Sequence, residues 1–453
     1  MYRSINPYNQ ILNASYESTP KKEFADIIQQ SSNVFKNFWR NLTVAERADR
    51  LKNLPELMKA KREDLAFMIT SEMGKPISQS RAEIDKSILL CEYYLTEAEG
   101  ILQPQTRNFP DKIFEVHYEP LGVILGIMPW NFPIWQAFRF AIPTLLAGNT
   151  ILLKPASSVP LSGKKMEELI GESLQKEFVF TCILPEQDHI ESIIAHPLVR
   201  GVSITGSTRA GAAVAERAGK YLKKCVLELG GSDPFIVWHD ADLDKAASRA
   251  VESRMNNNGQ TCNAAKRWLI HERVYDDFLN LIKEKIQELK IGDPLDEEVS
   301  ISTISSELIY KEVHQQIKKA INQGAEFWTV DGDPTAKWQI LPGILTNVSN
   351  TSAIANEELF GPVAQLYSFT DEDEMIRIAN QTDFGLGCSI WTADLEKARK
   401  WSGQVDCGYI SINQMLSSDP RVPFGGVKNS GFGRELGPEG LLEFVNVQTI
   451  QLP

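Results

Sequence analysis

Apolar side chains recur three and four positions apart along much of the first hundred residues. In the segment Leu51-Lys-Asn-Leu-Pro-Glu-Leu-Met, for example, residues 51, 54, 57 and 58 are apolar. This spacing predicts that residues 22–100 are largely helical. A short extended segment is predicted next, at Ile113–Tyr118, among prolines that interrupt helices, namely Pro104, Pro110 and Pro120.

After residue 121 short apolar runs alternate with helical patterns. The apolar runs, which we interpret as strands, cover residues 122–127, 150–153, 178–184, 202–205 and 225–229. The helical patterns between them lie at about 134–147, 161–175, 186–196 and 209–221. This alternation predicts right-handed βαβ crossovers and a parallel sheet covered on both faces. Such a sheet binds ligands beyond the carboxyl ends of its strands.

A second α/β block begins after Gly230. Its first strand is predicted at Pro234–Trp238, and helices follow near 242–257 and 274–289. The last residues, 445–453, alternate apolar and polar side chains, which is typical of a strand. The predicted fold class is therefore α/β. A chain of 453 residues exceeds the size of one hydrophobic core, so we expect two or three domains.

The segment Gly431-Phe-Gly433, with Gly437 close by, is similar to a glycine-rich dinucleotide-binding loop. The spacing of these glycines is wrong for that loop, and no βαβ unit surrounds them. We therefore interpret the segment as a loop whose glycines let the backbone approach other groups closely.

Charge and cysteine content narrow the classes of function. The chain carries 47 basic and 59 acidic side chains, a net charge of −12, which argues against a nucleic-acid or membrane partner. Its six cysteines show no C-x-x-C pair and no Cys/His ligand spacing, so we expect neither a metal site nor a disulfide framework. The N-terminus lacks a secretory signal, and no apolar segment is long enough to span a membrane. We therefore expect a reducing, cytoplasmic location, where a cysteine can act as a thiol.

Three side chains stand where chemistry is expected. Cys262 follows a polar turn that contains glycine, so we expect its sulfur in a cleft, with turn N–H groups lowering the pKa of the thiol. The alternative is an ordinary buried cysteine. Glu228 ends an apolar strand, where desolvation raises the pKa of a carboxylate towards that of a general base, unless it is a salt-bridged glutamate. Asn131, between two prolines, suits donation to a developing oxyanion, or is a turn asparagine.

The short segments that contain these three residues, together with others along the chain, resemble the aldehyde dehydrogenase superfamily. The resemblance rests on stretches in the family's order and spacing, P-W-N-F-P, L-K-P-A-S, T-G-S-T-x-x-G, L-E-L-G-G, N-G-Q-T-C, E-E-L-F-G-P-V and P-F-G-G-V-K-N-S-G-F-G-R-E. It extends from about residue 5 to the C-terminus. So many matching segments do not arise by chance. They favour a catalytic role, and not a structural one, for Cys262, Glu228 and Asn131.

The resemblance implies a role for each residue. Cys262 is implied as the nucleophile, Glu228 as the base, and Asn131, with the Cys262 backbone N–H, as the oxyanion hole. Thiolate attack, hydride transfer to a nicotinamide and hydrolysis of the resulting thioester would then oxidise an aldehyde to its acid. The implied cofactor-binding residues are Ile127, Trp130, Lys154, Ser157, Gly206, Ser207, Gly211, Glu358 and Phe360.

Within this resemblance, Ser157 bears on the choice of cofactor. Relatives that insist on NAD carry a glutamate at this position, which holds the adenosine ribose and would repel a 2′-phosphate. A serine removes that repulsion, so we expect NADP to be accepted alongside NAD. Lys164 and Lys165 are interpreted as a solvated helix face rather than as phosphate ligands.

For the aldehyde, the chain is similar to short bacterial succinate-semialdehyde dehydrogenases. Arg139, eight residues after Asn131, matches an arginine that binds the substrate carboxylate in such enzymes. Ser418 and Arg421 are expected to add further donors. One position departs from the pattern, because many of these enzymes carry a second arginine six residues before the cysteine, where this chain has Asn256.

That departure leaves other functions open. An aldehyde dehydrogenase for a different aldehyde is the main alternative. A CoA-acylating relative would normally lack Glu228, and an inactive relative would not retain cysteine, base and oxyanion donor together. Ala264, just past the nucleophile, excludes a local disulfide switch.

The resemblance also implies three regions. We expect a Rossmann-type cofactor-binding domain at 1–100 and 118–229, an α/β catalytic domain at 230–430, and a small β oligomerisation flap at 101–117 and 431–453. The flap would pair the extended stretch with the C-terminal strand. Its unpaired strand edges favour a homodimer or homotetramer.

Overall fold

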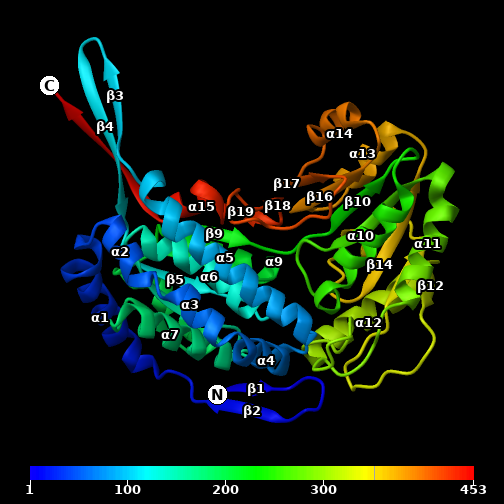
Figure 1. Ribbon diagram of the computed structural model, residues 1–453, viewed down its shortest axis with the longest axis horizontal. Coiled ribbons are helices and arrows are strands. Elements are labelled where there is room, and N and C mark those ends of the chain that lie inside the picture. The colour runs from blue at the N-terminus through cyan, green and yellow to red at the C-terminus, as the bar shows by residue number, and fades with distance from the viewer. Residues whose placement is uncertain (351) are drawn as a thin grey trace.

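The computed structural model describes residues 1–350 and 352–453, and two large, mostly parallel sheets lie side by side in it (Figure 1). The first sheet has the strand order β19-β9-β8-β5-β6-β7. Its parallel strands are β5 (Val123–Ile127), β6 (Thr150–Lys154), β7 (Phe180–Cys182), β8 (Val199–Thr205) and β9 (Lys224–Glu228). The helices between them are α6 (Pro133–Leu146), α7 (Pro160–Leu174), α8 (Ile190–Ala195) and α9 (Thr208–Lys220). The predicted alternation of strand and helix is confirmed, although β7 is shorter than expected.

Both faces of this sheet are covered, which explains why its strands are mostly apolar. In β5, Ile124 packs into the core beneath α6 and α7, whereas Val123 and Leu125 pack into the core beneath α8 and α9. Successive residues of a strand point to opposite faces, so a strand buried on both sides has few polar positions.

The N-terminal region forms the predicted helices, but as several separate ones. They are α1 (Phe24–Asn37), α2 (Val44–Leu51), α3 (Leu54–Ala60), α4 (Arg62–Met73) and α5 (Ile77–Ile101). A capping box of Thr43 and Glu46 begins α2, and Gly74, in the left-handed conformation, ends α4. The longest of them, α5, packs along α6 and so reaches the carboxyl end of the first sheet.

The second sheet has the strand order β12-β13-β14-β11-β10-β16-β17. Its strands are β10 (Asp233–Val237), β11 (Ala265–His271), β12 (Glu326–Thr329), β13 (Gly343–Thr346), β14 (Val363–Phe369), β16 (Gly387–Trp391) and β17 (Tyr409–Ile412), of which only β12 is antiparallel to its neighbour. Its helices are α10 (Leu243–Met255), α11 (Tyr275–Gln287), α12 (Glu307–Asn322), α13 (Glu372–Asn380) and α14 (Leu395–Ser402). The strand and the two helices predicted for the start of this block are confirmed.

A narrow antiparallel sheet projects from the body (Figure 1). It consists of β3 (Gln105–Phe109), β4 (Lys112–Pro120) and the C-terminal β20 (Val445–Leu452), with Val445 opposite Pro120. The predicted pairing of the extended stretch with the C-terminal strand is confirmed. The remaining elements are β1 (Tyr2–Ile5), β2 (Leu12–Tyr16), β15 (Phe384–Gly385), β18 (Val427–Lys428) and α15 (Gly437–Leu442).

The glycine-rich segment near the C-terminus lies against the first sheet. Residues Gly431–Phe432 form β19, antiparallel to β9. A side chain at Gly431, where φ is 112°, would lie 2.0 Å from the carbonyl oxygen of Leu227. The interpretation of these glycines as a means of close backbone approach is confirmed.

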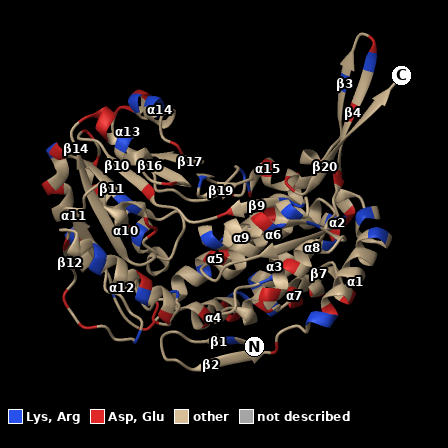
Figure 2. Ribbon diagram, turned by 180° about the vertical axis from the view of Figure 1, so that it is seen from behind, with Lys and Arg blue, Asp and Glu red and all other residues tan. Residues whose placement is uncertain are grey.

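Charges of both signs are interspersed along the outer helices (Figure 2). Within the described part of the chain, no helix combines the length and the apolar character that crossing a lipid bilayer requires.

One buried ion pair fixes the start of α6. The Lys75 ammonium pairs with Glu83 on α5, and both side chains are fully buried. The other carboxylate oxygen of Glu83 accepts hydrogen bonds from the backbone N–H groups of Ile134 and Trp135, at 2.9 and 3.0 Å. Glu83 thus supplies acceptors for the first turn of α6, whose N–H groups have no partner within the helix.

Replacing Lys75 with methionine is expected to destabilise the protein by about 3–5 kcal/mol, because the Glu83 carboxylate is then buried without a cation. The midpoint of urea unfolding measures the change. The double variant Lys75→Met/Glu83→Gln removes both charges and is expected to be more stable than the single variant. Equal loss in the two variants would contradict the importance of the unpaired charge.

Candidate functional site

The two sheets meet at the residues singled out from the sequence. Cys262 lies in the loop between α10 and β11, and Glu228 ends β9 of the other sheet. A side chain at Gly231 would lie 2.7 Å from the carbonyl oxygen of Cys262, and one at Gly230 would lie 2.4 Å from a carboxylate oxygen of Glu358. Gly230 and Gly231 therefore allow the backbone that follows Glu228 to pass directly beside Cys262 and Glu358.

The loop before Cys262 has an unusual backbone. Asn257, Asn258 and Gly259 are all left-handed, with φ of 54°, 55° and 75°, a conformation that asparagine and glycine adopt more readily than other residues. The side-chain amide of Asn258 donates to two backbone carbonyls from other segments, at 3.0 and 2.9 Å. A side chain at Gly259 would collide with the backbone of Gly361 at 2.3 Å. The position of Cys262 is thus fixed by the packing of its loop.

Asn131 lies against this loop. Its Nδ2 donates to the carbonyl of Gln260 at 3.0 Å, and its own carbonyl accepts from Nδ2 of Asn257 at 2.8 Å. A side-chain amide carries two N–H donors, so one N–H of Asn131 remains for a ligand.

A buried cluster of charges surrounds Glu228. Glu228, Arg139 and Glu435 are only 2–3% exposed, and the Arg139 guanidinium pairs with Glu435. Among the described residues Glu228 forms no ion pair, and its Oε1 accepts no hydrogen bond. Burial raises the pKa of Glu228 well above its ordinary value, and Arg139 opposes this. The expected desolvation of Glu228 is confirmed, and the structure does not show the alternative salt-bridged glutamate.

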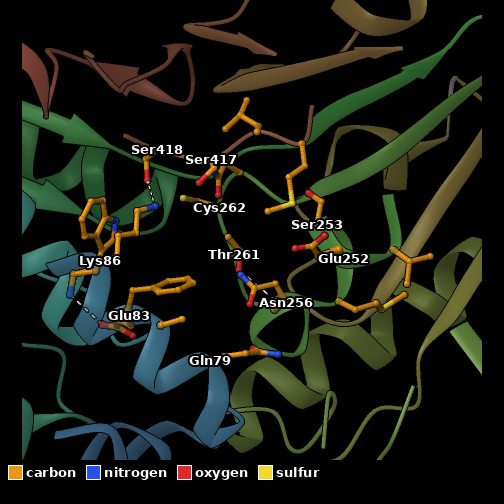
Figure 3. A pocket seen from close by; sticks show the side chains of 18 of the residues that line it. Gln79, Glu83, Lys86, Glu252, Ser253, Asn256, Thr261, Cys262, Ser417 and Ser418 are labelled. Carbon is orange, nitrogen blue, oxygen red and sulfur yellow. Dashed lines mark hydrogen bonds between the residues drawn. The ribbon is translucent and has the colours of Figure 1, made fainter. Parts of the chain in front are cut away.

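Cys262 borders a cavity of about 590 Å³ between α5, α6, α10 and the segment after β17 (Figure 3). Arg139, Ser418 and Asn256 line the same cavity. Two of the three predicted substrate ligands therefore share a space with the sulfur. The third, Arg421, is exposed and does not line it, and its guanidinium makes a bidentate pair with Asp419, at 2.8 and 2.6 Å.

The predicted cofactor residues come from both halves of the molecule. The rings of Trp130 and Phe360 meet edge to face at 5.8 Å between centroids. Oε1 of Glu358 accepts from the backbone N–H of Gly231 at 3.0 Å. Ile127 and Lys154 are register partners at the carboxyl ends of β5 and β6.

The N-terminus of α9 lies beside the end of β9. Ser207 caps the helix by accepting from the backbone N–H of Ala210, and the N–H of Gly206 donates to the carbonyl of Glu228 at 3.0 Å. A side chain at Gly211 would lie 2.4 Å from Leu229, so the glycine allows the helix to pack closely on the strand. The first N–H groups of a helix lack internal acceptors, which makes this end suitable for a phosphate.

The turn after β6 carries Ser157, which is exposed. The two lysines on the following helix α7 are already paired with glutamates of the same helix, Lys164 with Glu167 at 2.9 Å and Lys165 with Glu168 at 2.7 Å. Their interpretation as helix-face residues agrees with these contacts.

The aldehyde dehydrogenase family model matches residues 1–450 of this chain. The chain belongs to the aldehyde dehydrogenase family. It is 41% identical over 414 residues to a succinate semialdehyde dehydrogenase of Escherichia coli named for NAD(P)+, covering 91% of this chain and 89% of that protein. It is 38% identical over 451 residues to an NADP+-named succinate-semialdehyde dehydrogenase of Deinococcus radiodurans, covering 99% and 94%.

A solved structure gives the same result for the fold. The succinic semialdehyde dehydrogenase of Streptococcus pyogenes, determined in complex with NADP+, superposes with a TM-score of 0.97. It is 33% identical in sequence, and the match covers 100% of both chains. The predicted α/β aldehyde dehydrogenase fold is confirmed.

Sequence reasoning missed a buried lysine beside the nucleophile of this aldehyde dehydrogenase. Nζ of Lys266 donates to the carbonyls of Thr261 and Cys262, at 2.9 and 2.5 Å, and lies 3.1 Å from Oε1 of Glu358. Lys266 thus connects the nucleophile loop to a predicted cofactor ligand. The available signal was a charged pair, Lys266-Arg267, inside the otherwise apolar strand β11.

The acidity of the thiol differs from the expectation. Burial raises the pKa of Cys262 to about 11, and the cations of Arg139 and Lys266 oppose this only in part. The prediction that turn N–H groups lower this pKa is wrong, because the loss of hydration disfavours the thiolate more than the nearby positive charges favour it.

Alkylation of Cys262 by iodoacetamide, without cofactor, is therefore expected to accelerate about tenfold per pH unit between pH 7 and 9, since only the thiolate reacts. Lys266→Met is expected to react more slowly at each pH, because one ammonium that favours the thiolate is gone. Mass spectrometry of the peptide that contains residue 262 separates this reaction from alkylation of the other cysteines. A rate that levels off below pH 8 would show that the thiol is acidic after all.

Proposed function

We propose that this aldehyde dehydrogenase oxidises succinate semialdehyde to succinate with NADP or NAD, through a thioester on Cys262. The observation that carries the proposal is the shared cavity, which Cys262, Arg139 and Ser418 all line. A nucleophile and donors for a carboxylate in one cavity suit an aldehyde with a carboxylate at its far end. The similarity to enzymes named for this substrate supports the same conclusion.

The residues of the site then divide the reaction between them. The Cys262 thiolate adds to the aldehyde carbon, and the free N–H of Asn131 stabilises the oxyanion that forms. A nicotinamide held beside this site would supply the hydride acceptor. Glu228, whose pKa is raised by burial, takes the proton of the water that hydrolyses the thioester.

The cofactor fits the residues at the ends of the first sheet. In this assignment the N-terminus of α9 would hold the pyrophosphate, Lys154 and Ser157 the adenosine ribose, and Glu358 the other ribose. The Pro155-Ala-Ser157-Ser158 turn contains no carboxylate that would repel a 2′-phosphate.

We assign regions on the same basis. The cofactor-binding part comprises 1–100 and 118–229, the catalytic part 230–430, and the oligomerisation region 101–117 and 431–453. The projecting sheet exposes apolar side chains, including Phe109, Val447 and Ile450. A second copy of the chain that covered them would form a homodimer or homotetramer.

The rate of NADPH or NADH formation tests the substrate. The kcat/KM for succinate semialdehyde is expected to exceed that for butanal and benzaldehyde by about 100-fold or more, since hydrogen bonds from charged donors to the carboxylate contribute roughly 1.5–3 kcal/mol each. Butanal is the matched control, because it has the same number of carbons and no carboxylate. If butanal is oxidised equally well, the thioester chemistry stands and the proposed substrate does not.

Ser157→Glu tests the cofactor. The added carboxylate is expected to raise the KM for NADP by about tenfold or more through repulsion of the 2′-phosphate, while the KM for NAD changes little. Ser158→Glu places the same charge one residue further along and is the control for a general field effect. An equal rise in the KM for NADP in both variants would contradict a specific role of Ser157.

A further inference from the structure

A lysine outside the segments that carry the family resemblance lines the same cavity. Lys86 lies on α5 and lines the cavity together with Cys262 and Arg139. Figure 3 shows its ammonium pointing to Ser418, whose Oγ accepts a hydrogen bond from Nζ at 2.8 Å. The ammonium also lies over the ring of Trp135, 4.4 Å from its centroid. An ammonium has three N–H donors, so the bond to Ser418 leaves two for other acceptors.

No carboxylate neutralises this ammonium. Among the described residues Lys86 takes part in no ion pair within 4.0 Å, and the two nearby carboxylates are engaged elsewhere. Glu83 is paired with Lys75, and Asp419 is held by the bidentate guanidinium of Arg421. The charge of Asp419 still interacts with Lys86, but its direct partner is Arg421.

Two other cations line the cavity, and both are in ion pairs, Lys285 with Asp244 and Arg139 with Glu435. In Arg139 only Nη2 is left without a partner. Asn256, on the opposite wall, carries no charge. Among the described cations that line the cavity, only the ammonium of Lys86 is in no ion pair, and Arg139 adds one open N–H. A partly desolvated charge without a counterion is unfavourable, and an anionic ligand removes that cost.

We propose that Lys86, together with Ser418, binds the carboxylate at the far end of the substrate and sets the preference of this enzyme for aldehydes that carry one. The assignment rests on the proposed function, in which the aldehyde is succinate semialdehyde. Arg139 contributes its open N–H from the other side of the cavity, but its charge belongs to the pair with Glu435.

Lys86→Met tests this, because methionine keeps most of the apolar stem and removes the ammonium. The kcat/KM for succinate semialdehyde is expected to fall about 10- to 100-fold, mainly through KM, as for loss of a hydrogen bond to a charged group. The kcat/KM for butanal is expected to stay within about twofold. Lys86→Arg retains the charge and is expected to recover part of the preference.

Lys285→Met is the matched control. Lys285 also borders the cavity, but its ammonium is paired with Asp244 at 2.8 Å. Its removal is expected to leave the ratio of the two kcat/KM values unchanged. A fall as large as that of Lys86→Met would show that any nearby cation has this effect and would overturn the assignment.

The possible outcomes separate the two proposals. If the native enzyme prefers succinate semialdehyde and Lys86→Met keeps that preference, the assignment of Lys86 is overturned and the proposed function stands. If Lys86→Met loses activity on both aldehydes equally, and Lys86→Arg restores both equally, Lys86 has a structural role and the assignment is again overturned. If the native enzyme shows no preference, the proposed function fails and the assignment fails with it.

The pH dependence gives a second readout. Lys86 faces Arg139 from α6, Cys262 from its loop and Asp419 from the segment after β17, and it shares α5 with Glu83. Burial, with help from Arg139, lowers the pKa of Lys86 to about 8. Only the protonated form attracts a carboxylate, so the ratio of kcat/KM for succinate semialdehyde to that for butanal is expected to decrease as pH rises above 8. The titration of Cys262 affects both aldehydes and cancels in the ratio. In Lys86→Met the ratio is expected to be flat, and the same decrease in that variant would contradict the assignment.

Discussion

The close approach of backbone segments around Cys262 is the constraint on which the rest of the site depends. A side chain at Gly231 would meet the carbonyl of Cys262, and one at Gly259 would meet the backbone of Gly361. At Gly425 an added side chain would lie 2.6 Å from Oε1 of Glu228. Glu228 ends a strand of the first sheet and Cys262 precedes a strand of the second, so the contacts at Gly231 and Gly425 help to fix how the two halves of the molecule meet. The same contact brings the nucleophile beside the end of β9.

Close packing of this kind removes water and makes the charges of the site interact strongly. It raises the pKa values of both Cys262 and Glu228, which disfavours the thiolate and prepares the carboxylate to accept a proton. Arg139 opposes both shifts and Lys266 opposes that of Cys262, and each also binds a carboxylate or carbonyl next to the reacting groups. The site therefore gains its reactivity from a balance between desolvation and a few buried cations.

The aldehyde cavity draws on three distant parts of the chain. Helix α5 contributes Lys86, the loop after α10 contributes Cys262, and the segment after β17 contributes Ser418. Glu83, one turn before Lys86, holds the start of α6 and thereby the chain that follows Asn131. One helix thus supports both the proposed substrate site and the proposed oxyanion donor, which couples the stability of the N-terminal helices to the geometry of the reaction.

Local pattern by itself determined the strands and helices of the first sheet and the start of the second, because strands buried on both faces and helices buried on one have distinct spacings of apolar residues. The other strands of the second sheet were not predicted. Local pattern also indicated that the Gly431 segment is a loop of close backbone approach and not a dinucleotide-binding loop. The order and spacing of the short motifs indicated the family. The division of residues 22–100 into five helices and the N-terminal hairpin were not predicted, since caps and short strands carry weak signals. Only the tertiary structure decided the electrostatics of the site: the raised pKa of Cys262, the pairing of Arg139 with Glu435, and the unpaired ammonium of Lys86. Hydrophobic periodicity is a property of neighbouring residues, whereas hydration and ion pairing depend on which groups from remote segments come together.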